Sequence, residues 1–316
     1  MFKSDRNRHR QIPLRLWRRH AGSLLRYISV KKSWNAVRCL WHFSRGNTVI
    51  PTKPLFLKVE LSRHCTIHCP GCVSPKEYRF YPFEKFKRLV DSFGQYIFMS
   101  QLYEIGEPLH HPELLKCIGY AHKNRIGTVI STTLSLKKQD TYWRDLVSSG
   151  LDRLIVAIDG TTEAVYNRYR THGDLNLVMD NLKKIMQFRE EEGSKLFVEW
   201  QMIDFPWNQC EQHSAKRMAT ELGCDNFQII QDTSKLRKSA IKSENIRNRN
   251  CIWPYILLLV NVYGDVLPCF KPAYSPGTLG NLQDLDFAEI WNGEEIQRIR
   301  SKKLIRLRDG CRTCIE

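Results

Sequence analysis

Residues 55–72, LFLKVELSRHCTIHCPGC, contain the most informative pattern of this chain. An apolar run typical of a buried strand leads into a short loop that carries three cysteines, Cys65, Cys69 and Cys72. Three thiolates on one such loop can bind three irons of a [4Fe-4S] cluster and leave the fourth iron open for a small molecule. The neighbouring His64 and His68 keep a structural zinc site, with three cysteines and one histidine, as the alternative.

A second motif follows a second strand pattern. Residues 96–103 are largely apolar and run into Gly106-Glu107-Pro108. Together the two motifs resemble the radical S-adenosylmethionine (SAM) superfamily, which places C-x3-C-x2-C after its first barrel strand and a GEP sequence after its second. The resemblance extends over most of residues 55–316 and implies that the cysteine loop holds a SAM-binding [4Fe-4S] cluster.

Short apolar runs alternate with helical patterns after Pro51. The predicted strands are 55–61, 96–103, 128–132, 154–158, 197–202 and 227–230, and the predicted helices are 83–93, 112–123, 142–149, 175–192 and 208–222. This alternation indicates an α/β fold with a parallel sheet, and its six units match the partial (β/α)6 TIM-like barrel of the superfamily. Asp140 or Thr141 is the candidate N-cap of the third helix, and Asp174 that of the fourth.

Polar residues at the ends of the predicted strands are the candidate SAM ligands, because the active-site mouth of a barrel lies at the carboxyl ends of its strands. The resemblance implies that the GEP residues bind the ammonium group of SAM and that hydroxyls after the third strand bind its ribose or carboxylate. It also places an aspartate after the fourth strand near the ribose. The candidates are Gly106, Glu107, Pro108, Ser131, Thr133, Asp159 and Gln201.

Each of these residues also has a purely structural interpretation. The GEP sequence could be a surface loop, Ser131 and Thr133 could simply end a half-buried strand, and Asp159 could form a turn before Gly160. Gly71 cannot stack on the adenine of SAM as larger residues do at that position in the family, so Tyr78, Phe80 or Tyr81 would have to do so.

A second set of cysteines lies near the C-terminus: Cys251, Cys269, Cys311 and Cys314. The sequences around residues 264–269, 279–282 and 290–293 resemble SPASM-type C-terminal domains, in their shorter "twitch" form with one auxiliary [4Fe-4S] cluster. Structural zinc is again the alternative, because C-x2-C also occurs in zinc sites. The predicted domains are a basic helical extension (1–50), a radical SAM partial barrel (51–240) and an auxiliary-cluster domain (241–316).

The composition limits the class of protein. The chain has 316 residues, of which 42% are hydrophobic, enough for one large core and a small appended domain. Its eleven cysteines are grouped like metal ligands, and no apolar leader precedes them, so we expect a reducing cytoplasm and no disulfide framework. The longest apolar run, 256–260, is far below the length needed to span a bilayer.

The positive charge is concentrated at the N-terminus. Residues 1–48 contain 12 Lys or Arg and a single acid, Asp5, within a chain of formal net charge +16. Apolar residues recur there at helical spacing, for example Trp34, Val37 and Trp41. Three interpretations stay open: a helical extension packed on the barrel, contact with an anionic membrane surface, and binding of an acidic partner such as nucleic acid, the last being the least favoured.

The resemblance implies reductive cleavage of SAM to a 5′-deoxyadenosyl radical that abstracts a hydrogen atom from the substrate, with electrons from a donor such as a flavodoxin or ferredoxin. The similarity of the second cysteine set to that of twitch-bearing 2-deoxy-scyllo-inosamine dehydrogenases favours a two-electron oxidation of a sugar or cyclitol alcohol. A peptide-modifying SPASM maturase is the alternative, and a non-catalytic zinc protein that binds nucleic acid is a remote one. No catalytic base can be assigned, although Arg168, Arg170 and Lys271 lie in relevant segments.

Overall fold

The computed structural model describes residues 25–72, 74, 76–232, 251–268 and 277–301, which are organised around one sheet. In this described part the strand order is β6-β5-β4-β3-β2-β1-β7-β8-β9. The strands are β1 (Phe56–Val59), β2 (Met99–Gln101), β3 (Gly127–Thr132), β4 (Arg153–Ala157), β5 (Phe197–Asp204), β6 (Asn226–Gln231), β7 (Leu257–Val260), β8 (Asp265–Leu267) and β9 (Gly280–Asn281).

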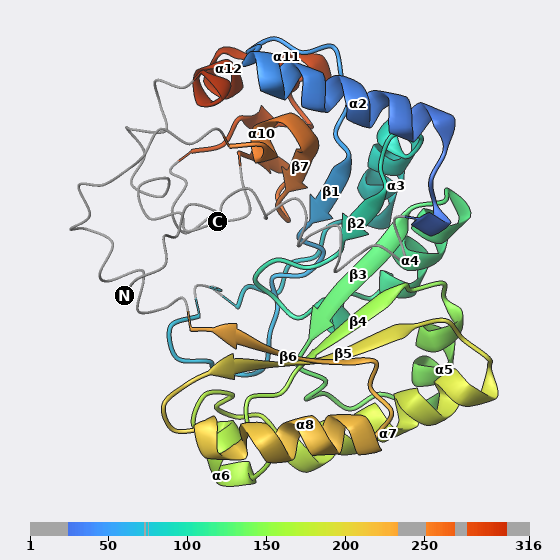
Figure 1. Ribbon diagram of the computed structural model, residues 1–316, viewed down its shortest axis with the longest axis vertical. Coiled ribbons are helices and arrows are strands. Elements are labelled where there is room, and N and C mark those ends of the chain that lie inside the picture. Colours follow the sequence, from blue (N-terminus) through green and yellow to red (C-terminus); the bar gives the residue numbers. More distant parts are fainter. Residues whose placement is uncertain (1–24, 73, 75, 233–250, 269–276, 302–316) are drawn as a thin grey trace, which may run out of the picture.

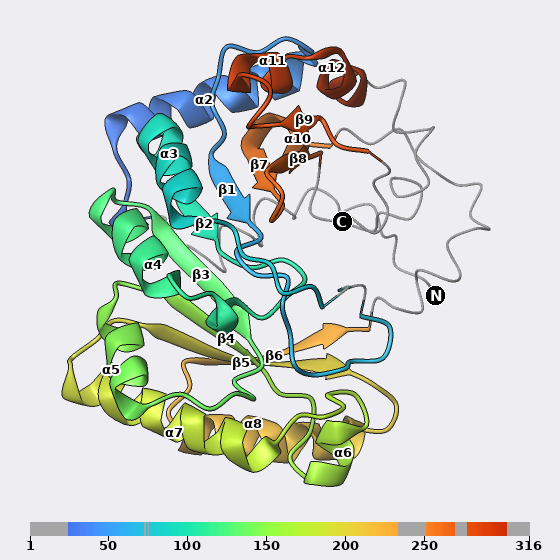
Figure 2. The ribbon, with the colours of Figure 1, turned by 180° about the vertical axis from the view of Figure 1, so that it is seen from behind.

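The helices cover the sheet from outside and close one of its ends (Figures 1 and 2). They are α2 (Val30–Arg45), α3 (Phe83–Phe93), α4 (Leu114–Lys123), α5 (Asp140–Ser148), α6 (Glu163–Asn167), α7 (Leu175–Glu191), α8 (Gln212–Glu221), α10 (Trp253–Ile256), α11 (Phe287–Trp291) and α12 (Glu294–Arg300). Two 3-10 turns, Pro108–His110 and Gln209–Glu211, complete the described elements.

Strands β1 to β6 pair in parallel with their neighbours, and α3, α4, α5, α7 and α8 connect them. These elements lie within a few residues of the predicted ranges, so the α/β fold with a mostly parallel sheet is confirmed. The five-residue helix α6 has no counterpart among the predicted elements. It is too short to show helical periodicity in the sequence.

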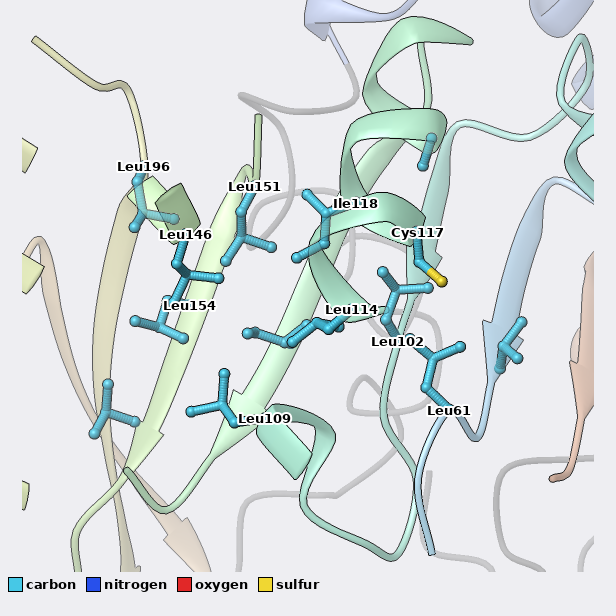
Figure 3. Packing of buried hydrophobic residues seen from close by; sticks show 14 of the residues in the cluster. Leu61, Leu102, Leu109, Leu114, Cys117, Ile118, Leu146, Leu151, Leu154 and Leu196 are labelled. Carbon is cyan, nitrogen blue, oxygen red and sulfur yellow. The ribbon is translucent and has the colours of Figure 1, made fainter. Parts of the chain in front are cut away.

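An outer apolar core fills the space between the strands and the covering helices. Its largest buried side chains include Trp143, Tyr166 and Trp200. In Figure 3, Leu114 and Ile118 lie on the side of α4 that faces the strands. Because the strands are buried on both faces, their sequences are continuous apolar runs instead of alternating patterns, as is typical of parallel sheets.

An inner apolar core fills the other face of the sheet at the amino ends of its strands. Ile155 of β4 belongs to this core, together with Cys39 of α2 and Trp291 of α11. Helix α2 thus closes this end of the sheet, with Cys39 fully buried. The expected helix in the N-terminal extension is therefore present, and it packs on the barrel.

Helix α2 is capped at both ends and tied to the barrel by polar contacts. Ser29 is its N-cap, and Gly46, with φ of 69°, occupies the left-handed C-cap position. Lys32 Nζ donates to the carbonyl of Arg125 at 2.5 Å, and the hydroxyl of Tyr27, just before the helix, donates to Asp152 at 3.1 Å. These contacts fix the orientation of the helix on the sheet.

Strand β7 extends the barrel sheet beyond β1. It pairs in parallel with β1, with Leu257 opposite Phe56 and Val260 opposite Val59. Strands β8 and β9 follow in antiparallel pairing. The C-terminal part of the chain therefore begins as part of the barrel sheet.

One of the two predicted N-caps is confirmed, and the other is wrong. Asp174 caps α7, because its Oδ1 accepts from the backbone N–H of Leu177 at 2.9 Å. Asp140 and Thr141 do not cap α5, because the helix already begins at Asp140 and Gln139 occupies the cap position without a side-chain hydrogen bond. Asp140 instead pairs with Lys184 of α7 at 2.7 Å.

Candidate functional site

The three cysteines of the first motif lie on one loop after β1, at the carboxyl ends of the parallel strands. Cys65 and Cys69 are half-buried and Cys72 is exposed, and all three are free thiols. The loop is held by backbone hydrogen bonds: the N–H of His68 donates to Thr171 at 2.7 Å, and that of Cys72 to Cys69 at 3.1 Å. The loop thus has a defined conformation, with its thiols available as ligands.

Two charged residues adjoin these thiols. Burial, and then the nearby carboxylate of Glu107, raise the pKa of Cys65 to about 11. Burial also raises the pKa of Cys69, whereas the guanidinium of Arg170 opposes this shift. Arg170 Nη1 lies 3.7 Å from the sulfur of Cys69. Because iron binds thiolates, assembly of a cluster here must displace protons from these cysteines.

The GEP loop packs directly against the cysteine loop. A Cβ atom on Gly106 would lie 2.1 Å from the carbonyl oxygen of Ser62, so only glycine permits this approach. The N–H of Glu107 donates to the carbonyl of His64 at 2.9 Å. Pro108, the first residue of a 3-10 turn, is buried.

The carboxylate of Glu107 is buried and points to the end of β3. Its Oε2 accepts from the N–H of Thr133 at 2.8 Å and from the hydroxyl of Thr133 at 3.0 Å, and its Oε1 accepts from Leu109 at 3.1 Å. Burial nevertheless raises the pKa of Glu107. Among the candidate SAM ligands, Glu107 and Thr133 are therefore brought into contact, and Ser131 lies half-buried on β3 nearby in sequence.

Asp159, after β4, is fully buried and paired. Its Oδ2 accepts from Arg170 Nε at 2.6 Å, and its Oδ1 accepts from the backbone N–H of Ile203 at 2.6 Å. Burial lowers the pKa of Arg170, but the carboxylate of Asp159 outweighs this effect and raises it above its usual range. Arg170 links Asp159 to the cysteine loop, a long-range contact that its sequence position did not indicate.

The inner face of the sheet carries polar side chains on neighbouring strands. Ile155 lies in the inner core and pairs with Glu199, and residues that pair across strands point to the same face. Glu199 is fully buried and accepts from Arg153 at 2.6 Å. Gln201, two residues further along β5, pairs with Gln228 of β6 and is half-buried.

A second buried ion pair occupies the same inner face on β1 and β2. Lys58 pairs in the sheet with Leu259 of the inner core, and its ammonium group contacts Glu104, which follows β2. The Lys58 ammonium lies 5.3 Å from the ring centroid of Tyr103. The only sequence signal for this pair is a lysine that interrupts an apolar strand.

Several polar atoms beside the cysteine loop and on the inner face have no hydrogen-bond partner among the described residues. They are His64 Nδ1, His110 Nε2 and Gln228 Oε1. The ring centroids of His64 and His110 are 4.5 Å apart. Burial, and then the charge of His64, lower the pKa of His110 to about 4. Buried polar atoms without partners are rare and suggest a missing ligand or water.

The aromatic residues after the cysteines differ in accessibility. Tyr78 is 78% exposed and lies against His64, with 5.1 Å between the ring centroids. Tyr81 is buried, and its carbonyl contacts the Nε2 of His111 at 2.7 Å. Tyr78 and Phe80 therefore remain candidates for stacking on adenine, whereas Tyr81 belongs to the core.

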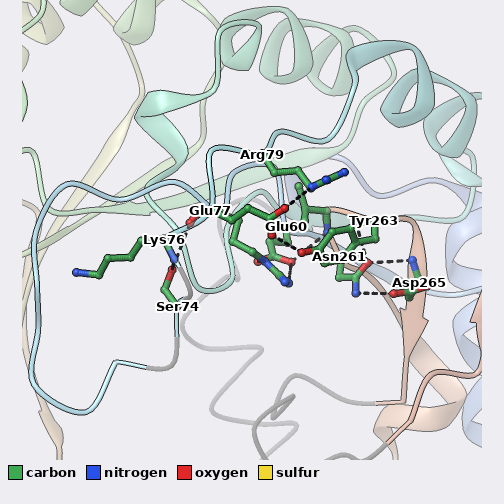
Figure 4. A network of polar contacts seen from close by, with 10 residues as sticks. Glu60, Ser74, Lys76, Glu77, Arg79, Asn261, Tyr263 and Asp265 are labelled. Atoms are coloured by element: carbon green, nitrogen blue, oxygen red, sulfur yellow. Dashed lines mark hydrogen bonds and ion pairs between the residues drawn. The ribbon is translucent and has the colours of Figure 1, made fainter.

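A polar network fastens the loop after the cysteines to the turn between β7 and β8 (Figure 4). Arg63 pairs with Glu60 at 2.7 Å, and the hydroxyl of Tyr263 donates to Glu77. The guanidinium groups of Arg63 and Arg79 lie 4.7 and 4.9 Å from the ring centroid of Tyr263. The cysteine loop is thus attached to the start of the C-terminal region.

The second cysteine set is only partly described. Cys251, just before α10, is half-buried. Cys269, Cys311 and Cys314 lie outside the described residues, as does Lys271.

The first loop can hold an iron-sulfur cluster. In the described part of the chain no three or more His, Cys, Asp or Glu side chains are arranged to hold a metal ion. The thiolates of a [4Fe-4S] cluster bind different irons and therefore need not converge on one point. Three free thiols on one loop, with partnerless polar atoms next to them, fit such a cluster and a polar ligand.

Comparisons with known proteins agree with this geometry. Residues 251–315 match the SPASM family, described as an iron-sulfur cluster-binding domain. The chain is 22% identical over 290 residues to the PqqA peptide cyclase of Gluconobacter oxydans (strain 621H), a match that spans 77% of this chain and 78% of the relative.

Two solved structures share the fold. SuiB of Streptococcus suis, bound to its precursor peptide SuiA, has a TM-score of 0.59 and 13% identity, covering 89% of this chain and 75% of SuiB. BtrN, in complex with AdoMet and 2-DOIA, has a TM-score of 0.52 and 16% identity, covering 84% of this chain and 94% of BtrN.

The parallel barrel sheet, the cysteine loop and the C-terminal match together support the class expected from the sequence, a radical SAM enzyme with a SPASM-type C-terminal domain. The C-terminal match is to an iron-sulfur cluster-binding domain, and BtrN is in complex with AdoMet, so both findings support the expected cofactors: SAM, a SAM-binding [4Fe-4S] cluster and an auxiliary cluster. The fold class and the cofactors predicted from the sequence are confirmed. Which residues bind these cofactors, and the domain limits at residues 50 and 240, stay predictions.

Proposed function

We propose that this enzyme abstracts a hydrogen atom from a C–H bond of a substrate bound at the carboxyl ends of β1–β6. One observation carries the proposal: Glu107 and the Asp159–Arg170 pair both contact the cysteine loop at this end of the sheet. SAM held at a cluster of this kind supplies a 5′-deoxyadenosyl radical, which takes the hydrogen atom. The protein contributes binding, orientation and exclusion of water.

Different residues would bind the cluster, position the loops and contact SAM. Cys65, Cys69 and Cys72 would hold the SAM-binding cluster, and Arg170 keeps a positive charge beside the sulfur of Cys69. Glu107 fixes the spacing between the cysteine loop and the end of β3 through its contacts with His64 and Thr133. The residues proposed to contact SAM are Gly106, Glu107, Pro108, Ser131, Thr133, Asp159 and Gln201.

The second cysteine set would serve a different purpose. Cys251, Cys269, Cys311 and Cys314 would ligate every iron of the auxiliary cluster, so this site leaves no open position for SAM. Its proposed part is to take up one electron from the substrate after the hydrogen atom has left. With the loss of one proton to a base, the substrate then undergoes a net two-electron oxidation. A flavodoxin or ferredoxin is the proposed electron donor for the first cluster.

A sugar or cyclitol alcohol is the proposed substrate class. The polar inner face supports this choice, because charged and amide side chains on neighbouring strands can bind several hydroxyl groups. Gln228 has an acceptor atom without a partner among the described residues, and Gln201 lies opposite it on β5. Such groups could orient one C–H bond of a polyol.

A peptide is the second candidate substrate. It is favoured by the sequence similarity to the PqqA peptide cyclase and by the fold shared with the peptide-bound SuiB. The hydrogen abstraction would be the same. The following step would depend on the group that receives the substrate radical.

The enzymatic proposal is tested by anaerobic reconstitution with iron and sulfide. We expect about eight irons per chain, and formation of 5′-deoxyadenosine when SAM and a reductant are added. A Cys65→Ala/Cys69→Ala/Cys72→Ala variant should lose about half of the iron and all of the 5′-deoxyadenosine. Cys210→Ala, which removes an exposed cysteine outside both sets, is the matched control. Bound zinc without iron would contradict the proposal.

The substrate class is tested by deuterium transfer. Deuterated sugar or cyclitol alcohols should give deuterated 5′-deoxyadenosine, whereas transfer only from deuterated peptides would favour the second candidate. If Gln228 binds the substrate, Gln228→Leu should raise KM by about tenfold without changing iron content. Gln187→Leu, on the exposed surface of α7, should leave KM unchanged.

A further inference from the structure

Helix α2 has a continuous apolar stripe that faces solvent. Val30, Trp34, Val37 and Trp41 are 88%, 64%, 56% and 52% exposed. Their spacing of four, three and four residues places them along one side of the helix, opposite the fully buried Cys39. Among the described residues, Leu25, Ile28, Leu40 and Val49 add exposed apolar surface at or near α2.

The stripe is not needed to hold the helix in place. The opposite side of α2 packs on the barrel through Lys32, Asn35 and Cys39, which are buried. Asn35 exchanges two hydrogen bonds with the backbone of Lys53, at 2.9 and 3.1 Å. A contiguous exposed apolar patch that does not serve folding marks an interaction surface.

Positive charge lies along one edge of this stripe. On a helical projection Lys31, Arg38 and Arg45 fall together beside Trp34 and Trp41. The guanidinium of Arg45 lies 5.8 Å from the ring centroid of Trp41. Residues 6–59 contain no Asp or Glu at all, so the partner that this charge complements is an anionic one.

We infer that the outer face of α2 docks the enzyme on an anionic membrane surface. Tryptophan rings prefer the boundary between lipid headgroups and acyl chains, and flanking Lys and Arg side chains attract anionic headgroups. Among the described residues, no helix is long and apolar enough to cross a bilayer, so docking through α2 is peripheral.

The position of α2 makes this docking compatible with catalysis. The helix lies at the end of the sheet opposite the cysteine loop (Figures 1 and 2). A bilayer on its outer face would leave the carboxyl ends of β1–β6 accessible. The inference stands independently of the proposed reaction, because it uses no residue of the cysteine loop.

The test is co-sedimentation of the full-length protein with vesicles. We expect binding to vesicles of equal parts phosphatidylcholine and phosphatidylglycerol, weaker binding to phosphatidylcholine alone, and a decrease as salt is added. Trp34→Ser/Trp41→Ser should weaken the binding at least about tenfold. Arg38→Ser/Arg45→Ser should weaken it by about fivefold for each cation removed.

Matched controls change the same kinds of residue elsewhere. Lys216→Ser/Arg217→Ser removes two exposed cations from α8, and Ile229→Ser removes an exposed apolar residue from β6, so both should bind vesicles as the unaltered protein does. Absence of binding to the anionic vesicles, or equal binding by the Trp34→Ser/Trp41→Ser variant, would overturn the inference. A dimer in light scattering that this variant abolishes would also overturn it, since a second copy would then cover the stripe.

Discussion

The two ends of the parallel sheet differ in the side chains that fill them. At the carboxyl ends, buried charged groups are held by specific partners, such as Asp159 by Arg170 and Glu107 by Thr133. At the amino ends, the inner core is apolar and α2 closes it with Cys39. The amino ends also hold buried charged groups, such as Asp152 beside Tyr27, but an apolar core fills most of this end.

This difference indicates where function lies. Burying charges and leaving polar atoms without partners costs stability, and proteins keep such features mostly at functional sites. The buried carboxylates of Glu107 and Asp159 beside the cysteine loop mark the carboxyl ends as the reactive end. The amino ends also bury charged residues, such as Lys32, Asp152 and Arg300, but no cysteine loop lies there among the described residues, and their unusual feature is the exposed stripe of α2. The proposed reaction and the proposed membrane docking are thus assigned to opposite ends of the sheet.

The largest expected effect comes from breaking the buried ion pair at the carboxyl ends. Arg170→Met leaves the carboxylate of Asp159 buried without its cation, which should lower the free energy of unfolding by about 3–5 kcal/mol. Thermal unfolding of the metal-free protein measures this change. The control is Arg144→Met, whose partners Glu191 and Glu192 are on the surface, and its effect should be much smaller. If both variants lost the same free energy of unfolding, the buried ion pair would stabilise the protein no more than the surface ion pairs do.

A second test concerns the close contact between the GEP loop and the cysteine loop. Gly106→Ala places a Cβ atom 2.1 Å from the carbonyl oxygen of Ser62, so the two loops must separate. We expect a loss of about 1–3 kcal/mol of stability and weaker SAM binding, measured by unfolding and by calorimetry.

Gly119→Ala is the matched control for this substitution. Its Cβ atom would meet nothing closer than 3.9 Å, and alanine favours the helix α4, so stability should stay unchanged or rise by up to about 1 kcal/mol. If both variants behave alike, the loop contact does not constrain the site.

The sequence predicts the barrel well because the information is local. Each parallel strand is a short apolar run between longer helical patterns, and Gly106-Glu107-Pro108 follows its strand directly. The sequence does not predict β7, because the apolar run 256–260 is too short to distinguish a strand from a buried helix. In addition, β1, the strand that pairs with β7, lies about two hundred residues earlier in the chain.

The site is predicted less completely than the fold. Asp159 is identified, but its partner Arg170 is not, because an ion pair between two loops has no fixed spacing in the chain. The pair of Lys58 and Glu104 is missed for the same reason. Polar atoms without partners, such as Gln228 Oε1, can be recognised only when the surrounding side chains are placed.

A third test examines the amino ends, where the buried cation Lys32 lies beside the apolar packing. Burial, and then the positive charge of Arg125, lower the pKa of Lys32 from 10.5 to about 8. Between these pH values the unfolded chain binds more protons than the folded one, so the Lys32 contribution makes the protein more stable as pH rises from 8 towards 10.5.

The variant Lys32→Met isolates this contribution. Its stability relative to the unaltered protein should fall by about 1–2 kcal/mol between pH 8 and pH 10.5, measured by urea unfolding at several pH values. Lys123→Met, at an exposed position on α4, controls for the removal of one positive charge. Parallel pH curves for the Lys32→Met variant and the unaltered protein would show that this lysine is solvated in the folded state.

The smallest expected effect concerns the solvent-facing side of α2 at the amino ends of the strands, in comparison with the inner core at the same end. Trp34 is 64% exposed on α2, whereas Trp291 of α11 is 1% exposed in the inner core. Trp34→Ser should change the free energy of unfolding by no more than about 0.5 kcal/mol, since serine and tryptophan have similar helix propensities and little packing is lost. Trp291→Ala should cost about 3–5 kcal/mol, because it leaves a cavity. If Trp34→Ser destabilised the protein comparably, the stripe would belong to the fold and would not be available for docking.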